Sequence, residues 1–366
     1  MSPARHSILG ALALATVALG ACQEGSARRT QYPPQPPGYG YGQYPPGYPA
    51  QPGYPAQPGY PAPPGYPAPP GYPAQPQPGH PAQPQPAAPA TPQPSPAPVA
   101  NDPITANDLV WLRSRAQWML STLVASLPAS QANQVAGIPL VVDDTVGEVN
   151  AFASCTKGGK RAMAITDGLL DIEAHLAQAR ATDEIFGTHK TDEYIRLIAQ
   201  HQRPKQPIVQ PPAGFFDPAQ QVDGRKVARQ HVLFDEQLGF VLGHELGHHY
   251  LGHLNCSASS GPLTPAEIGQ VLSSAVPLFN QPNEIAADIA GTNNILTAGT
   301  RQPGRWTEAG GVLTMQFFAG LEQLSPVDVL FSFDRDHPAP QLRIPIIQQA
   351  ANTWRLTGGR LPLPSL

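Results

Sequence analysis

Hydrophobic and polar positions follow two different periods after residue 107, and these periods predict helices and strands. Apolar residues recur every three or four positions from 109 to 127, behind Asn107 or Asp108 as a cap, which predicts an amphipathic helix. Short apolar segments then predict two or three strands, at 138–142, 149–154 and 161–166. The pair Gly158 and Gly159 predicts the turn between the last two strands.

Helical patterns dominate the remaining sequence. Asp167 begins one predicted helix, residues 183–200 form another, and the Pro-rich segment 204–218 predicts a surface loop. A long apolar helical pattern follows from about 232 to 254. Further helices are predicted at 265–275, 280–297, 309–323 and 339–354. The expected fold class is α+β: a mostly helical domain with one small β-sheet.

The segment before residue 102 has a different composition. Residues 31–100 contain 27 of the 47 prolines and nine of the eleven tyrosines, but no Asp, Glu, Lys or Arg. Five hexads of the form PGYPA[QP] follow one another from Pro46. So few aliphatic side chains cannot offset the entropy of ordering, so we predict a disordered arm at 22–101. We interpret it as a spacer; the alternative is that its tyrosines bind the cell wall or a protein.

The first 21 residues predict an export signal. Arg5 precedes an apolar run from 8 to 19, and small residues stand directly before Cys22. This pattern resembles the bacterial lipobox, in which the cysteine is lipidated and becomes the first mature residue. The alternative is an ordinary cleaved signal. By resemblance to lipoprotein sorting, Gln23 rather than an Asp after the cysteine favours the outer membrane, so we expect a lipid-anchored protein that faces the periplasm.

For the remaining domain, 102–366, net charge argues against nucleic acid as a partner and cysteine content predicts a disulfide. A formal net charge of −4 for the whole chain does not provide the basic face that a nucleic-acid-binding protein requires. If Cys22 carries lipid, Cys155 and Cys256 remain as an even pair in an oxidising compartment. We therefore predict a disulfide between these two, with two free buried thiols as the alternative.

The motif HExxH lies inside the long helical pattern, as His244, Glu245 and His248. Residues at i and i+4 share a helix face, so both imidazoles can bind one zinc ion. Glu245 follows the first ligand and can accept a proton from zinc-bound water as general base. The alternative is a solvent-exposed His-rich helix, because His249 and His253 follow the motif.

The third zinc ligand decides the class of metallopeptidase. A metzincin requires Gly and His seven and ten residues after the first His, whereas Gly252 and His253 stand eight and nine after it. If the helix continued, His253 would lie roughly opposite His244. A gluzincin requires a Glu on a second helix and an Asp four residues later. Glu284 and Asp288 fit this pattern, as third ligand and as hydrogen-bond acceptor for a ligand histidine. The alternative is a surface pair of carboxylates.

Four sequence blocks resemble, in family order, the HtpX-like and CaaX-prenyl-protease-like gluzincin metallopeptidases, particularly their soluble periplasmic lipoprotein members. The blocks are 149–152 with 166–170, HELGH at 244–248, 284–288, and 336–338 with Arg343. The resemblance implies a zincin-type domain that hydrolyses misfolded or misassembled envelope proteins. It also implies that the substrate lies along an edge strand near 150–154.

The resemblance places His337 in the His-Pro pair of the closing block. There it would donate to the oxyanion of the reaction or occupy the open zinc position in a latent state; the alternative is a structural role. Other candidate donors are His231, His249, Tyr250, His253 and Arg343.

Together these features predict a zinc-dependent endopeptidase with one Zn²⁺ per chain, acting on proteins or peptides. The alternatives are a chaperone-like zinc-containing lipoprotein with little turnover, and a structural lipoprotein whose arm binds the cell wall. Glu245 favours the enzyme, because a site without turnover has no chemical need for a general base.

Overall fold

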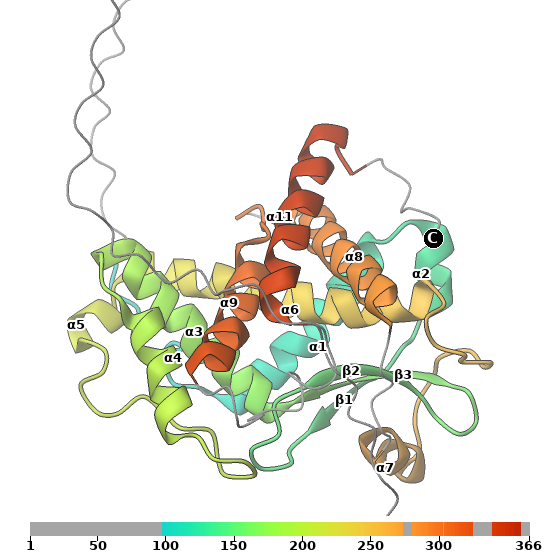
Figure 1. The fold of residues 1–366 in the computed structure, drawn as a ribbon, viewed down its shortest axis with the longest axis horizontal. Coiled ribbons are helices and arrows are strands. Elements are labelled where there is room, and N and C mark those ends of the chain that lie inside the picture. Colours follow the sequence, from blue (N-terminus) through green and yellow to red (C-terminus); the bar gives the residue numbers. More distant parts are fainter. Residues whose placement is uncertain (1–96, 274–279, 303, 325–338, 360–366) are drawn as a thin grey trace, which may run out of the picture. The chain divides into compact units, whose positions relative to one another are not determined.

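Helix α6 (Gly224–Tyr250) crosses the middle of the domain in the computed structural model, which describes residues 97–273, 280–302, 304–324 and 339–359 (Figure 1). Asp223 caps its first turn by accepting hydrogen bonds from the backbone N–H groups of Arg225 and Lys226. Every residue from Leu233 to Tyr250 is buried. Helix α6 is therefore a core helix, packed on several sides rather than along one stripe.

Most of the other helices pack around α6. The most extensive contacts with it are made by α1 (Leu109–Ser126), α3 (Asp167–Phe186), α8 (Gln281–Gly299) and α9 (Ala309–Leu324). Helix α11 (Pro340–Thr357) packs on α8 and α9, and α4 (Lys190–His201) packs on α3 and α9. The shorter helices are α2 (Ala129–Val135), α5 (Pro218–Gln221) and α7 (Pro265–Ser273).

Small residues allow α6 and α8 to approach closely. A Cβ atom on Gly243 would lie 3.2 Å from Cα of Gly291, and one on Gly247 would lie 2.9 Å from Cβ of Ala290. Glycine inside a helix costs roughly 0.5–1 kcal/mol relative to alanine. Here that cost is offset by close packing between the two helices that carry the candidate zinc ligands.

A three-stranded sheet lies beside α6, in the order β1-β3-β2, and comprises β1 (Leu140–Asp143), β2 (Ala151–Cys155) and β3 (Arg161–Thr166). Strand β3 pairs parallel with β1 and antiparallel with β2, so β2 is an edge strand. Met163 and Ile165 of β3 face the main core, whereas Ala162 and Ala164 pack in a second cluster with Val271 of α7. Both faces are covered, which explains why β3 is apolar at consecutive positions.

A disulfide joins the end of β2 to the segment after α6. Cys155 and Cys256 are bonded, with their Cα atoms 5.4 Å apart. The same segment meets the β2–β3 turn, where the N–H of Ala258 donates to the carbonyl of Gly159 over 2.9 Å. Gly159 has a φ of 78°, which a glycine adopts without strain.

The predicted fold class is confirmed, and the differences concern the boundaries of helices and strands and two short helices, α2 and α5, that were not predicted. Residues 183–200 do not form one helix, because Gly187 adopts a φ of 69° and ends α3 before α4 begins at Lys190. Helix α6 begins at Gly224 rather than near 232 and ends at Tyr250 rather than 254. Asp108, not Asn107, caps α1.

Several sequence predictions lie outside the described residues. These are the signal segment, Cys22, the hexad repeats and His337. Among the helices that are described, none is long and apolar enough to cross a membrane.

Candidate metal centre

The three predicted zinc ligands meet where α6 crosses α8. The Nε2 atoms of His244 and His248 lie 3.1 Å apart. The carboxylate of Glu284 approaches both rings, with Oε2 3.4 Å from Nε2 of His244 and Oε1 3.5 Å from Nε2 of His248. All three side chains are at most 2% exposed. The solvent-exposed His-rich helix considered from the sequence is therefore wrong.

This arrangement fits a zinc ion. A tetrahedral ion bound at about 2.0–2.1 Å from each ligand separates its ligand atoms by about 3.3–3.4 Å. The three observed separations, 3.1, 3.4 and 3.5 Å, lie close to that value. Two imidazoles and one carboxylate also form one of the donor sets found at catalytic zinc sites. The residues that would hold the metal are therefore His244, His248 and Glu284.

Asp288 and Arg343 lie behind the first ligand. Nδ1 of His244 donates to Oδ1 of Asp288 over 3.0 Å. Asp288 lies on α8, one helical turn beyond Glu284. Arg343, which comes from α11, donates to Oδ1 of Asp288 over 2.6 Å and to Oδ2 over 3.0 Å. Asp288 accepts a hydrogen bond from Nδ1, so the proton of His244 stays on Nδ1. His244 therefore presents the lone pair of Nε2 toward Glu284 and His248.

The electrostatics of the centre favour a bound cation. Burial alone would lower the pKa of His244, but hydrogen bonds to Asp288 and Glu284 raise it to about 9. Burial would raise the pKa of Asp288, yet Arg343 and His244 hold it below its ordinary value. The carboxylates thus stabilise positive charge at the histidine rings, which is the position that a metal ion would occupy.

Glu245 lies beside the ligands, with Oε1 3.9 Å from Nε2 of His244. The backbone N–H of Ala153 in β2 donates to Oε2 of Glu245 over 2.8 Å and fixes the orientation of the carboxylate. Burial raises the pKa of Glu245 to about 7, and Glu284 acts in the same direction. A carboxylate with such a pKa is suited to accept and return a proton near neutral pH.

His253 lies next to the second ligand, contrary to the position expected from an unbroken helix. Its Nδ1 is 2.9 Å from Nδ1 of His248, and the two ring centroids are 5.0 Å apart. The helical projection fails because α6 ends at Tyr250. Among the described residues, the group that could hold a metal ion comprises His244, His248 and Glu284, and His253 is not part of it.

The other candidate hydrogen-bond donors have structural partners. His249 donates from Nε2 to the carbonyl of Ala162 over 3.0 Å, and burial lowers its pKa to about 4. The hydroxyl of Tyr250 pairs with the amide of Asn294. His231 pairs with Asp102 near the other end of α6.

Sequence reasoning missed two contacts of the centre and recognised a third residue only in part. The missed contacts are the hydrogen bond from Ala153 to Glu245 and the contact between His253 and His248. Arg343 was considered as a hydrogen-bond donor, but its pairing with Asp288 was not predicted. Only His253 carried a local signal, because Gly252 is a residue type that commonly ends a helix.

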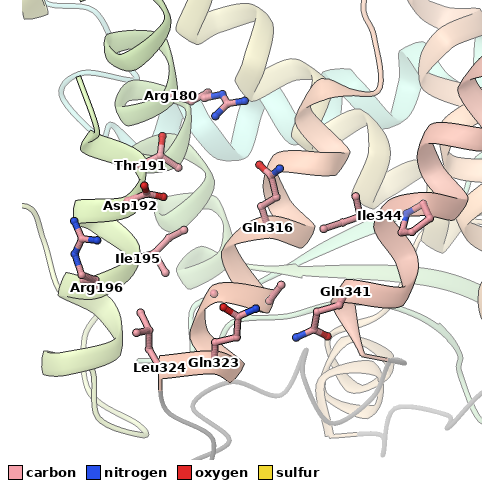
Figure 2. A pocket seen from close by; sticks show the side chains of 13 residues that line it. Arg180, Thr191, Asp192, Ile195, Arg196, Gln316, Gln323, Leu324, Gln341 and Ile344 are labelled. Atoms are coloured by element: carbon pink, nitrogen blue, oxygen red, sulfur yellow. The ribbon is translucent and has the colours of Figure 1, made fainter. Parts of the chain in front are cut away.

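A separate surface pocket of about 650 Å³ lies between α4, α9 and α11 (Figure 2). Gln341 and Pro345 of α11 line it, whereas Arg343 of the same helix faces Asp288. Positions two residues apart on a helix lie about 200° apart. The pocket is therefore distinct from the metal centre.

The comparisons with known proteins agree with the geometry of the centre. The model of peptidase family M48 matches residues 114–344, a range that includes the three ligands, Glu245, Asp288 and Arg343. No curated protein and no solved structure matches the chain. The family match covers well over half of the chain, and together with the buried site it shows that the chain belongs to peptidase family M48.

Proposed function

We propose that this M48 metallopeptidase is a zinc-dependent endopeptidase in which Glu245 is the general base. The family supports zinc-dependent peptidase activity. The role of Glu245 as general base rests on the position of its carboxylate, which lies 3.9 Å from Nε2 of His244 and is oriented by the N–H of Ala153. A zinc ion, when bound, polarises the scissile carbonyl and lowers the pKa of its bound water toward about 7.

The chain's own residues move the proton and hold the site in place. Glu245 accepts the proton of the attacking water and returns it to the leaving amide nitrogen. Asp288 keeps the proton of His244 on Nδ1, so that Nε2 stays available to the metal. Burial of all these side chains excludes bulk water, which strengthens each electrostatic contact.

We propose that the substrate binds as an extended peptide along β2. The N–H of Ala153 points to Glu245 and therefore away from β3. Because backbone groups alternate along an antiparallel strand, those of Ala151 and Cys155 point the same way. These outward groups at a sheet edge can pair with a peptide backbone, a mode of recognition that requires no particular sequence.

We further propose that the protein acts in the bacterial cell envelope on misfolded or misassembled proteins, anchored by lipid on Cys22. The export signal and lipobox-like sequence support this location. The disulfide between Cys155 and Cys256 also supports it, because disulfides form and persist in oxidising compartments. Replacing Cys22 with Ser should release the protein from membranes; unchanged partitioning would contradict the anchor.

The direct test compares the full mature chain with its Glu245→Gln variant, purified in detergent. We expect wild type to cleave casein and the variant to retain zinc but lose hydrolysis. Glu193→Gln, on the surface of α4, is the matched control and should cleave normally. If wild type and Glu245→Gln both bind unfolded casein and neither cleaves it, the chaperone-like alternative is supported instead.

A further inference from the structure

We propose that His253 is a positioning residue for the zinc ligand His248. It accepts a hydrogen bond from Nδ1 of His248 and thereby fixes the ring with Nε2 directed at the metal. The two Nδ1 atoms are 2.9 Å apart, and the rings meet edge to face at an interplanar angle of 66°. The inference rests on the zinc site of the proposed function and extends it to a residue beyond the three ligands.

The end of α6 places His253 in this position. The N–H of His253 donates to the carbonyl of His248 over 3.0 Å, and the N–H of Gly252 donates to that of His249 over 3.3 Å. This pair of bonds is a Schellman motif, with Gly252 in the left-handed conformation at a φ of 78°. A continued helix would turn His253 about 140° away from His248. The motif instead turns the chain so that the side chain of His253 lies next to that of His248.

The proton arrangement follows from the ligand geometry. Nε2 of His248 faces Nε2 of His244 and the carboxylate of Glu284, so Nε2 is the atom available to the metal. A neutral imidazole that binds a metal through Nε2 carries its proton on Nδ1 and must donate there. Nδ1 of His253 is then the acceptor, and His253 carries its own proton on Nε2.

The two zinc-binding histidines therefore have different partners. His244 donates to the carboxylate of Asp288, whereas His248 donates to a neutral imidazole. Among the described residues, the charged groups of the buried centre are three carboxylates and one guanidinium: Glu245, Glu284, Asp288 and Arg343. A zinc ion brings the sum of these charges to zero. A carboxylate in place of the half-buried His253 would add a fourth negative charge beside a site whose charges already cancel, which is unfavourable.

The test measures zinc affinity, by competition with a chromophoric chelator, on the full mature chain. His253→Ala removes the hydrogen-bond acceptor of His248. His253→Asn keeps an acceptor, because Oδ1 of Asn takes the position of Nδ1 of His253. Loss of a partner behind a metal ligand typically costs about 10–100-fold in metal affinity. We expect that loss for His253→Ala and recovery of most of it in His253→Asn. His201→Ala, an exposed histidine on α4, is the matched control.

The outcomes separate this inference from the proposed function. Wild-type zinc affinity in His253→Ala would overturn the inference alone, as would equal losses in the Ala and Asn variants, because packing rather than the hydrogen bond would then explain them. If wild type itself bound no zinc, the proposed function would fail. Thermal unfolding of the metal-free variants checks that each one folds, and His253→Asn keeps the test decisive if His253→Ala does not.

Discussion

The guanidinium of Arg343 spans both carboxylate oxygens of Asp288, although the two residues are 55 positions apart and both are buried. Removing one member of a buried ion pair leaves an uncompensated charge and typically costs about 3–5 kcal/mol. We expect Arg343→Met to lose stability in this range by urea unfolding of the zinc-free protein. Arg343→Lys should lose less, because it keeps the charge but cannot span both oxygens. A change below about 1 kcal/mol in Arg343→Met would contradict this role.

Zinc should stabilise the fold as well as support catalysis, because its ligands join α6 to α8. A ligand present at 1,000 times its Kd stabilises the native state by about 4 kcal/mol. We expect a chelator to lower the Tm of wild type and added zinc to restore it. Glu284→Ala should unfold at the same temperature with or without zinc. A Tm of Glu284→Ala that rises with zinc would show that Glu284 is not required for binding.

The close crossing of α6 and α8 should not tolerate a side chain at Gly291. A Cβ atom there would lie 2.9 Å from both the backbone N of His244 and the carbonyl oxygen of Phe240. We expect Gly291→Ala to lose about 1–3 kcal/mol of stability and to weaken zinc binding by separating the two helices. Gly269→Ala in α7 is the matched control, because a Cβ there meets nothing within 4 Å. It should gain up to about 1 kcal/mol, and equal losses in both variants would refute the argument.

Glu173 in α3 should make the protein less stable as the pH rises. Burial raises the pKa of its carboxyl from 4.5 to about 8, and Thr314 donates to it only over 3.5 Å. Between these two values the folded chain keeps a proton that the unfolded chain releases, so stability falls with pH by at most about 1.4 kcal/mol per unit. Glu173→Gln should flatten this dependence and be the more stable protein at pH 8. Parallel stability curves for the two proteins between pH 5 and pH 8 would contradict the prediction.

The disulfide should contribute substantially to stability, because Cys155 and Cys256 are 101 positions apart. In the chain-entropy model, closing a loop of that length stabilises by about 4.7 kcal/mol. We expect both cysteines of the exported protein to resist thiol labelling until reductant is added. Cys155→Ser with Cys256→Ser should lower the denaturant midpoint without loss of fold. Free thiols at both positions in the untreated protein would disprove the pairing.

The sequence by itself determined the features that depend on neighbouring residues. The fold class followed from the periods of apolar positions, and β3 occupies 161–166 as predicted. His244 and His248 share a helix face because residues four apart always do, whatever surrounds the helix. The position of His253 beside His248 also follows from a local feature, because Gly252 ends the helix. The helix was projected past Gly252 from the sequence, so the prediction for the position of His253 was wrong.

The tertiary structure alone decided which distant groups meet. Ala153 and Glu245 are 92 positions apart, and Arg343 reaches Asp288 only because α11 packs on α8. No local pattern specifies such contacts, because they depend on how closely helices pack and on the angle at which they cross. Burial likewise belongs to the assembled fold, and it is burial that raises the pKa of Glu245 to about 7. Helix geometry places the residues of the motif, and packing gives them their chemistry.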